Sequence, residues 1–156
     1  MKPRQQPPFV ELTVLLFAVW QSQDLLNAWQ HSPHDRFGWI ALLVWLTPLV
    51  ARLTGGSIAS AKANPFLLGG AIFAGALSSL TELHFFGHIA LALALAGWLK
   101  ISWRKLIWVA TALAWMPALG WLLADLSSPI IITLRLTIAL AGAICIWPKL
   151  KTANEA

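Results

Sequence analysis

The apolar residues of this chain fall into long runs separated by short polar stretches. A membrane-spanning helix needs about 20 mostly apolar residues to cross a hydrocarbon core of about 30 Å. Runs that approach this length cover residues 8–26, 38–53, 65–83, 84–99, 106–124 and 129–147. The pattern therefore predicts an all-α fold: one integral membrane domain over residues 1–156, built as a polytopic bundle of about six transmembrane helices.

Two local features support helices within these runs. Pro65 and Pro129 suit the first turn of a helix, where no backbone N–H is needed. The alternating stretch "ALALALAG" at residues 90–97 imitates a strand, but an open strand could not satisfy its backbone groups in lipid. We therefore expect a helix there as well.

Composition agrees with a membrane protein. Hydrophobic residues make up 58% of the chain and charged residues 11%, whereas a soluble domain has about 25% charged residues. The net charge is +5, but the basic residues lie in small clusters between apolar runs, so we expect the lipid bilayer as partner and no nucleic acid. Several tryptophans lie near run ends, as in an interfacial belt: Trp20, Trp29, Trp39, Trp98, Trp103 and Trp147.

The distribution of lysine and arginine predicts the orientation. Most of the 11 basic residues fall in alternate loops, together with the two chain ends, and basic loops stay in the cytoplasm. We expect a multi-pass protein of the inner (plasma) membrane with both termini cytoplasmic. The segment "HSPHDRFGW" at residues 31–39 is then an extracytoplasmic loop, and all four histidines lie at the outer face.

Polar residues near this outer face form a candidate cleft. Gln21, Asp24 and His31 share one helix face if the first helix is continuous. Arg135 lies inside the last span, where a charge is costly without a partner, and the expected partners are Asp24, Glu82 and Asp125. The alternatives are a solvated helix end and a structural ion pair. The predicted cleft comprises Gln21, Asp24, His31, His34, Asp35, Glu82, His84, His88 and Arg135.

A metal site is an alternative use of the histidines. His84 and His88 lie one helical turn apart, and zinc would need about two more ligands. If the two outer loops meet, the candidates are His31, His34, Asp35 and Glu82. The spacing lacks the glutamate of the HExxH motif, and we expect no cofactor. The single cysteine, Cys145, lies toward the cytoplasmic side, far from every histidine, and is expected to be a packing residue.

Two segments resemble a known family. Residues 26–53, "LNAWQHSPHDRFGWIALLVWLTPLVARL", and the stretch 95–142 around "GWLKISWRK" are similar to exosortases and archaeosortases, which are polytopic membrane transpeptidases. The resemblance implies only the non-catalytic front half of that family. The Cys-Ser-Gly context of the family's nucleophile is missing here, so neither Cys145 nor Arg135 takes over a catalytic role.

These observations favour an interaction protein. We expect an exosortase-like accessory subunit in surface-protein or exopolysaccharide export or sorting, which binds another membrane protein or a lipid-linked substrate. A metal- or histidine-dependent membrane enzyme with its site at the outer face is one alternative, and if active it would be a transpeptidase-like enzyme completed by a partner chain. A small transporter subunit is the other.

Overall fold

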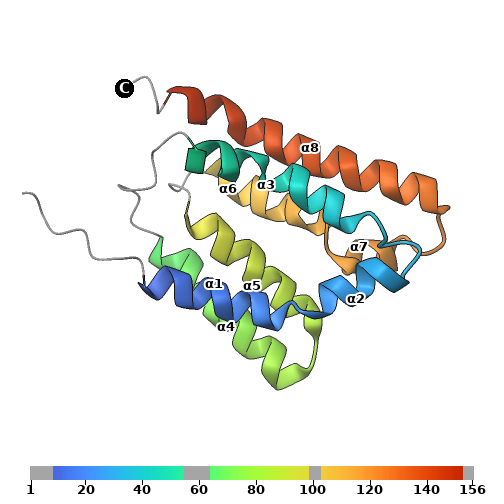
Figure 1. Cartoon of the computed structure of the whole chain (residues 1–156), viewed down its shortest axis with the longest axis horizontal. Coiled ribbons are helices and arrows are strands. Elements are labelled where there is room, and N and C mark those ends of the chain that lie inside the picture. The colour runs from blue at the N-terminus through green and yellow to red at the C-terminus, as the bar shows by residue number, and fades with distance from the viewer. Residues whose placement is uncertain (1–8, 55–63, 99–102, 153–156) are drawn as a thin grey trace, which may run out of the picture.

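The computed structural model describes residues 9–54, 64–98 and 103–152, and every regular element among them is helical (Figure 1). No strand occurs among these residues, so the all-α prediction is confirmed. The elements in chain order are α1 (Phe9–Gln21), α2 (Asp24–His31), α3 (Gly38–Thr54), α4 (Pro65–Thr81), α5 (His84–Gly97), α6 (Trp103–Ala110), the 3₁₀ helix η2 (Thr111–Ala114), α7 (Pro117–Leu122) and α8 (Ser128–Thr152).

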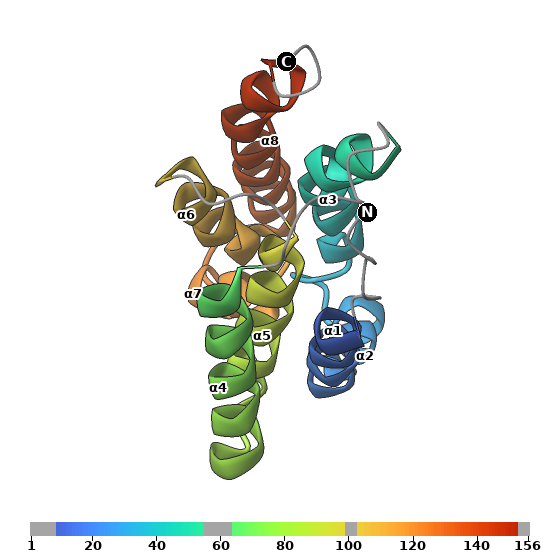
Figure 2. The ribbon, with the colours of Figure 1, turned by 90° about the vertical axis from the view of Figure 1, so that its left-hand side faces the viewer.

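The helices pack as two groups that lie side by side (Figure 2). In one group α1, α4 and α5 contact one another, and in the other α8 contacts α3, α6 and η2. Contacts of α5 with α6 and of α2 with α7 join the groups. Helices α5 and α7 therefore belong to different groups and lie close to the contacts that join them.

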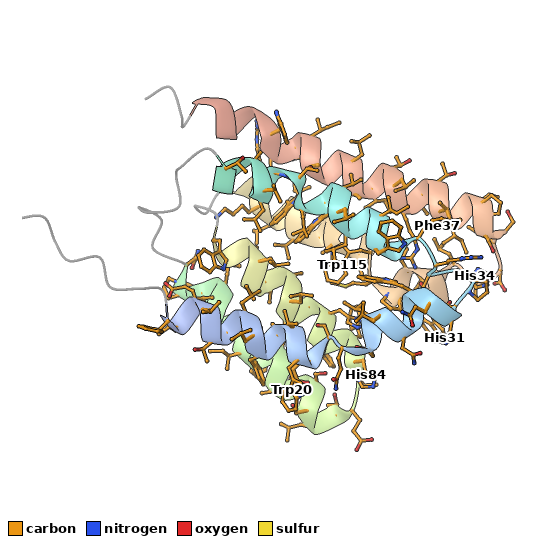
Figure 3. All side chains as sticks on the ribbon, in the orientation of Figure 1. Trp20, His31, His34, Phe37, His84 and Trp115 are labelled. Carbon is orange, nitrogen blue, oxygen red and sulfur yellow. The ribbon has the colours of Figure 1, made fainter. Side chains whose placement is uncertain are left out.

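Successive long helices run in alternate directions. The starts of α1, α4 and α6 and the ends of α3, α5 and α8 lie at one end of the bundle (Figure 1). The opposite end carries α2, α7 and the side chains of His31, His34 and His84 (Figure 3). We call this the histidine end. The histidines were predicted at one face, and His31, His34 and His84 do share one end of the molecule.

The first predicted helix, 8–26, is wrong as a continuous element. It breaks after Gln21 into α1 and α2, whose axes bend by 42°. At the break, the buried hydroxyl of Ser22 lies 2.9 Å from the carbonyl oxygen of Ala18 and 2.9 Å from that of Gly87 in α5. A serine that bonds back to the preceding turn weakens the regular helix ladder, and here it also fastens the break to a neighbouring helix.

The fifth predicted helix, 106–124, is also interrupted, and it becomes α6, η2 and α7. Pro117 has no N–H and restricts the residue before it, so Met116 is extended, with ψ of 142°. The interruption leaves backbone carbonyls without helical partners. Two indoles supply donors: Trp45 Nε1 donates to the Trp108 carbonyl at 2.8 Å, and Trp29 Nε1 donates to the Trp115 carbonyl at 3.1 Å.

Buried tryptophans form the centre of the second helix group. The rings of Trp45 and Trp108 stack with centroids 3.8 Å apart, and Trp108 Nε1 donates back to the Trp45 carbonyl at 3.1 Å. Trp115 meets Trp45 edge-on at 5.9 Å. Trp29 is buried too, with 9% of its surface exposed, whereas Trp20 is 62% exposed.

Helices α4 and α5 are shorter than the predicted spans, whereas α3 and α8 are not. The third and fourth runs become α4 and α5, separated by Glu82 in the left-handed conformation, with φ of 57°. By length and apolar composition, Ser128–Trp147 within α8 is the one described helix able to cross a membrane alone, and the bent α1–α2 pair qualifies if it counts as one span. Helices α3, α4 and α5 are apolar but shorter, and the six-span arrangement stays a prediction.

Candidate functional site

Arg135 is fixed at the histidine end by a buried ion pair. Its side chain is fully buried, and Nη2 contacts the carboxylate of Asp35, which lies in the loop between α2 and α3 and is 6% exposed. Nη1 donates to the carbonyls of Ala114 and Met116 at 2.8 and 3.1 Å. Both carbonyls lie where η2 ends before α7, and that of Met116 also accepts from the Leu119 N–H at 3.2 Å. One guanidinium therefore connects α8 to the loop of Asp35 and to this helix break.

The predicted partners of Arg135 were wrong. Asp24, Glu82 and Asp125 were expected because they share the outer end of the chain, but the ion pair forms with Asp35. Gly120 in α7 packs directly on this pair, and a Cβ there would overlap the Asp35 carboxylate. The close approach of α7 therefore requires glycine at this position.

A second polar pair lies across the space between the helix groups. His88 in α5 is 3% exposed, and its Nε2 lies 3.0 and 3.1 Å from the two carboxylate oxygens of Asp24, at the start of α2. The carboxylate accepts, so Nε2 carries the hydrogen. The other ring nitrogen, Nδ1, is buried and has no hydrogen-bond partner among the described residues.

The break between α1 and α2 positions this pair. A Cβ on Gly87 would overlap the backbone carbonyl of Gln21, so the end of α1 can lie directly on α5 only because residue 87 is glycine. Ser22 bonds to the Gly87 carbonyl in the same place. Asp24 follows two residues later and thereby reaches His88, one residue beyond Gly87.

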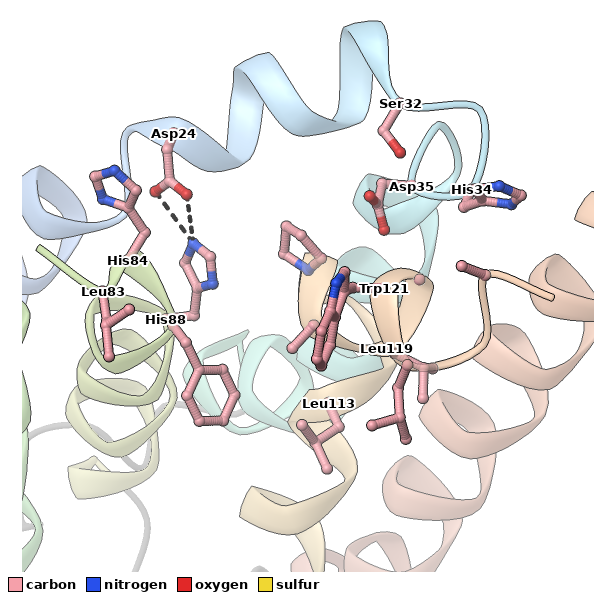
Figure 4. Close-up of a pocket in the computed structure, with 16 residues that line it drawn as sticks. Asp24, Ser32, His34, Asp35, Leu83, His84, His88, Leu113, Leu119 and Trp121 are labelled. Atoms are coloured by element: carbon pink, nitrogen blue, oxygen red, sulfur yellow. Dashed lines mark hydrogen bonds and ion pairs between the residues drawn. The ribbon is translucent and has the colours of Figure 1, made fainter. Parts of the chain in front are cut away.

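A pocket of about 840 Å³ lies between the two polar pairs (Figure 4). This volume is in the range of small-molecule sites. Its polar lining consists of Asp24, Ser32, His34, Asp35, His84 and His88. The remainder is apolar and comes from the start of α5, from η2 and from α7 and the residues after it: Leu83, Phe85, Leu113, Pro117, Ala118, Leu119, Gly120, Trp121, Leu122 and Ala124.

The apolar side of the pocket reaches the surface of the molecule. Trp121 is 80% exposed, Leu122 71% and Leu83 57%, although all three line the pocket. Exposed apolar residues around a cavity indicate contact with lipid or with another apolar surface. An amphipathic molecule fits this arrangement, with its apolar part along α7 and its polar part between His88 and Asp35.

The structure divides the predicted cleft residues. Asp24, His34, Asp35, His84 and His88 line the pocket. Gln21 does not line the pocket, and its Nε2 donates to the Ser79 hydroxyl at 2.6 Å. The predicted stripe through Gln21, Asp24 and His31 is interrupted because the helix breaks after Gln21. His31 is exposed and bonds to the carbonyl of Asn27 in its own helix. Glu82 is exposed at the end of α4, and Arg135 lies behind Asp35.

The candidate metal ligands do not come together in the part of the chain that the structure describes. There, no group of three histidine, cysteine, aspartate or glutamate side chains has an arrangement that could hold a metal ion. His84 and His88 are one turn apart, as predicted, but His88 directs Nε2 to Asp24 and His31 lies outside the pocket lining. A metal site at these histidines therefore gains no support from the geometry.

No protein-family model, curated protein or solved structure matches this chain. The resemblance to exosortases therefore stays a prediction. The function has to be argued from the pocket itself.

Sequence reasoning missed the apolar half of the pocket and its tryptophan support. Leu119, Trp121 and Leu122 were assigned to the interior of a regular span, where they would face lipid or packing partners. Pro117, in the middle of that run, was the available signal. A proline inside an apolar run often breaks a helix, and broken helices with free carbonyls are a common origin of polar sites in membrane proteins.

Proposed function

We propose that this protein is a multi-pass protein of the inner membrane, with both termini cytoplasmic, and that its pocket at the histidine end binds an amphipathic molecule on the outer side. The observation that carries this proposal is the pocket of about 840 Å³, which joins an apolar wall at α7 to a rim of histidines and carboxylates. Sites that combine a large apolar surface with a few convergent polar groups are typical of ligand binding.

Exposed apolar helix faces support the membrane environment. Along α4, Phe66, Phe73 and Leu80 repeat every seven residues and are 87%, 67% and 80% exposed. A soluble protein rarely leaves so large a contiguous apolar stripe uncovered. The alternating helix directions and the long apolar helix Ser128–Trp147 agree with several passes through a bilayer.

The role we propose is that of an accessory or interaction subunit. In this hypothesis the chain is exosortase-like but without a nucleophile, and it presents a lipid-linked or secreted substrate to a partner membrane protein in surface-protein or exopolysaccharide export or sorting. The lone thiol, Cys145, is in the half of α8 remote from the histidine end, so it is not proposed to react with a ligand in the pocket.

Ligand binding is testable with protein reconstituted in phosphatidylcholine nanodiscs. We expect saturable binding of monodecanoylglycerol by isothermal titration calorimetry, after subtraction of partitioning into empty nanodiscs. Trp121→Ala should weaken binding by about tenfold, because it removes a large apolar contact worth about 1.5–3 kcal/mol when covered. Trp121 is 80% exposed without ligand, so the fold should tolerate the change.

Trp20→Ala is the matched control. Trp20 is also a strongly exposed tryptophan, at 62%, but it does not line the pocket, so its replacement should leave the affinity unchanged. Absence of saturable binding, or equal losses in both variants, would contradict a ligand site in this pocket.

The His88–Asp24 pair also favours a second candidate, a histidine-dependent membrane hydrolase. A histidine held by a carboxylate, with its other nitrogen free toward a cavity, is the arrangement of a general base and its orienting group. The same preparation distinguishes the candidates, since a hydrolase would release decanoic acid from the probe and lose this turnover in His88→Gln.

A further inference from the structure

The lining of the pocket also indicates the chemistry of the ligand's head. Resting on the proposed function, we propose that the polar head donates a hydrogen bond to Nδ1 of His88 and carries no negative charge. A hydroxylated lipid or a free hydroxylated amphiphile has this chemistry.

Asp24 sets the orientation of the His88 ring. Nε2 lies 3.0 and 3.1 Å from the Asp24 oxygens, and because an ionised carboxylate only accepts, it holds the hydrogen on Nε2. In the neutral ring Nδ1 is then a hydrogen-bond acceptor. The geometry thus presents a lone pair to the pocket instead of an N–H group.

The acceptor Nδ1 is unpaired within the part of the chain that the structure describes. Nδ1 is buried without a hydrogen bond among the described residues, on a side chain that is 3% exposed, and it faces the pocket between α5 and α7 (Figure 4). A buried acceptor left unpaired is costly, and a ligand that supplies a donor removes the cost. A ligand without a donor leaves the cost in place and also excludes water from the site.

The charge around the pocket disfavours an anion. Among the described residues, its lining includes the carboxylates of Asp24 and Asp35 and neither lysine nor arginine. The guanidinium of Arg135 is engaged by Asp35 and by the carbonyls of Ala114 and Met116, and it lies outside the lining. A phosphate or carboxylate head would therefore meet Asp24 without a compensating cation, and an anionic ligand is disfavoured.

The experiment compares three probes that share a decyl or decanoyl chain, in the nanodisc assay described above. They are monodecanoylglycerol, its dimethyl ether and decyl phosphate. We expect the hydroxylated probe to bind about tenfold more tightly than the ether, because the ether cannot donate a hydrogen bond and leaves the buried Nδ1 acceptor unpaired. Decyl phosphate should bind more weakly than either.

Variants test whether His88 is the origin of the preference. His88→Phe retains a flat ring without nitrogen, so it should abolish the preference for hydroxyl over ether and leave the affinity for the ether in place. Asp24→Asn should reduce the preference while keeping the imidazole, because an amide can pair with either tautomer. His31→Gln, which changes a histidine outside the pocket lining, should retain the full preference.

The outcomes are distinguishable. Saturable binding with equal affinity for hydroxyl and ether, or a preference that survives His88→Phe, overturns this inference and leaves the proposed function standing. Tighter binding of decyl phosphate overturns it as well, and identifies a charged imidazolium as donor. Absence of saturable binding for all three probes overturns the proposed function itself. Displacement of the probe by dioleoylglycerol in the nanodisc would identify the ligand as a bilayer lipid.

Discussion

The guanidinium of Arg135 shows how one residue holds three parts of the histidine end together. It is fully buried, and it contacts the Asp35 carboxylate and donates to two backbone carbonyls at the break before α7. Removing one partner of a buried ion pair leaves an uncompensated charge, which is more damaging than removing both. The network therefore predicts a specific order of stabilities among variants.

Asp35→Asn should lower the free energy of unfolding by about 3–5 kcal/mol, since it neutralises the charge that balances Arg135 while keeping the shape of the side chain. Adding Arg135→Met should recover part of this loss, because the buried charge then disappears. Thermal melts in detergent would measure both. Asp125→Asn, at an exposed aspartate near the same end, is the control and should change stability by less than about 0.5 kcal/mol. A double variant less stable than Asp35→Asn alone would refute this account.

Sequence reasoning recognised that Arg135 needs an anion but chose the wrong one. Asp35 lies 100 residues from Arg135 in the chain, and its loop meets the guanidinium at the level of the Ala114 and Met116 carbonyls. The sequence pattern predicts how far along its helix each residue lies. It does not predict which loop turns inward, because that depends on the packing of three distant segments.

The helices themselves were predictable, and of the two interruptions only the one at Pro117 carried a sequence signal. Apolar runs located α3, α4, α5 and α8 with small errors at the ends, because each run is a continuous stretch of helix-compatible residues. The break at Ser22 depends on a carbonyl of α5, and the break before Pro117 depends on indole donors from α2 and α3. These partners become neighbours only in the folded bundle.

Gly87 offers a test of the first break. Gly87→Ala should destabilise the protein by about 1–3 kcal/mol, because the added Cβ would overlap the Gln21 carbonyl, a backbone atom that cannot move without shifting α1. It should also weaken ligand binding, since Asp24 follows the break and orients His88. Unfolding in detergent and the calorimetric assay would measure the two effects.

Gly69→Ala is the matched control, because Gly69 lies in α4 and a Cβ there has no neighbour within 4 Å. This substitution should leave stability unchanged or raise it by up to about 1 kcal/mol, as expected for alanine replacing glycine in a helix. Equal effects at positions 69 and 87 would mean that the contact between α1 and α5 does not determine the break.

At the scale of the whole molecule, the proposal depends on which ends of the helices face the outside. His31 at the end of α2 and Thr54 at the end of α3 are both exposed, and α3 carries the chain from the histidine end to the opposite end of the bundle (Figure 1). A bilayer crossed by α3 would place these two residues on opposite sides. Most lysines and arginines fall at the two chain ends and in the loops predicted on the same side, so the sequence predicts that the Thr54 side is cytoplasmic.

Cysteine labelling in intact cells measures this directly. In a Cys145→Ala background, a cysteine introduced by His31→Cys should react with an impermeant maleimide from outside, and one introduced by Thr54→Cys should react only after the cells are permeabilised. The reverse pattern would keep the spans but move the pocket to the cytoplasmic side, against an outer ligand. Labelling of both positions from outside would contradict a membrane crossing between them. The exposed apolar stripe of α4 would then have to be covered by protein instead of lipid, because exposing such a surface to water is costly.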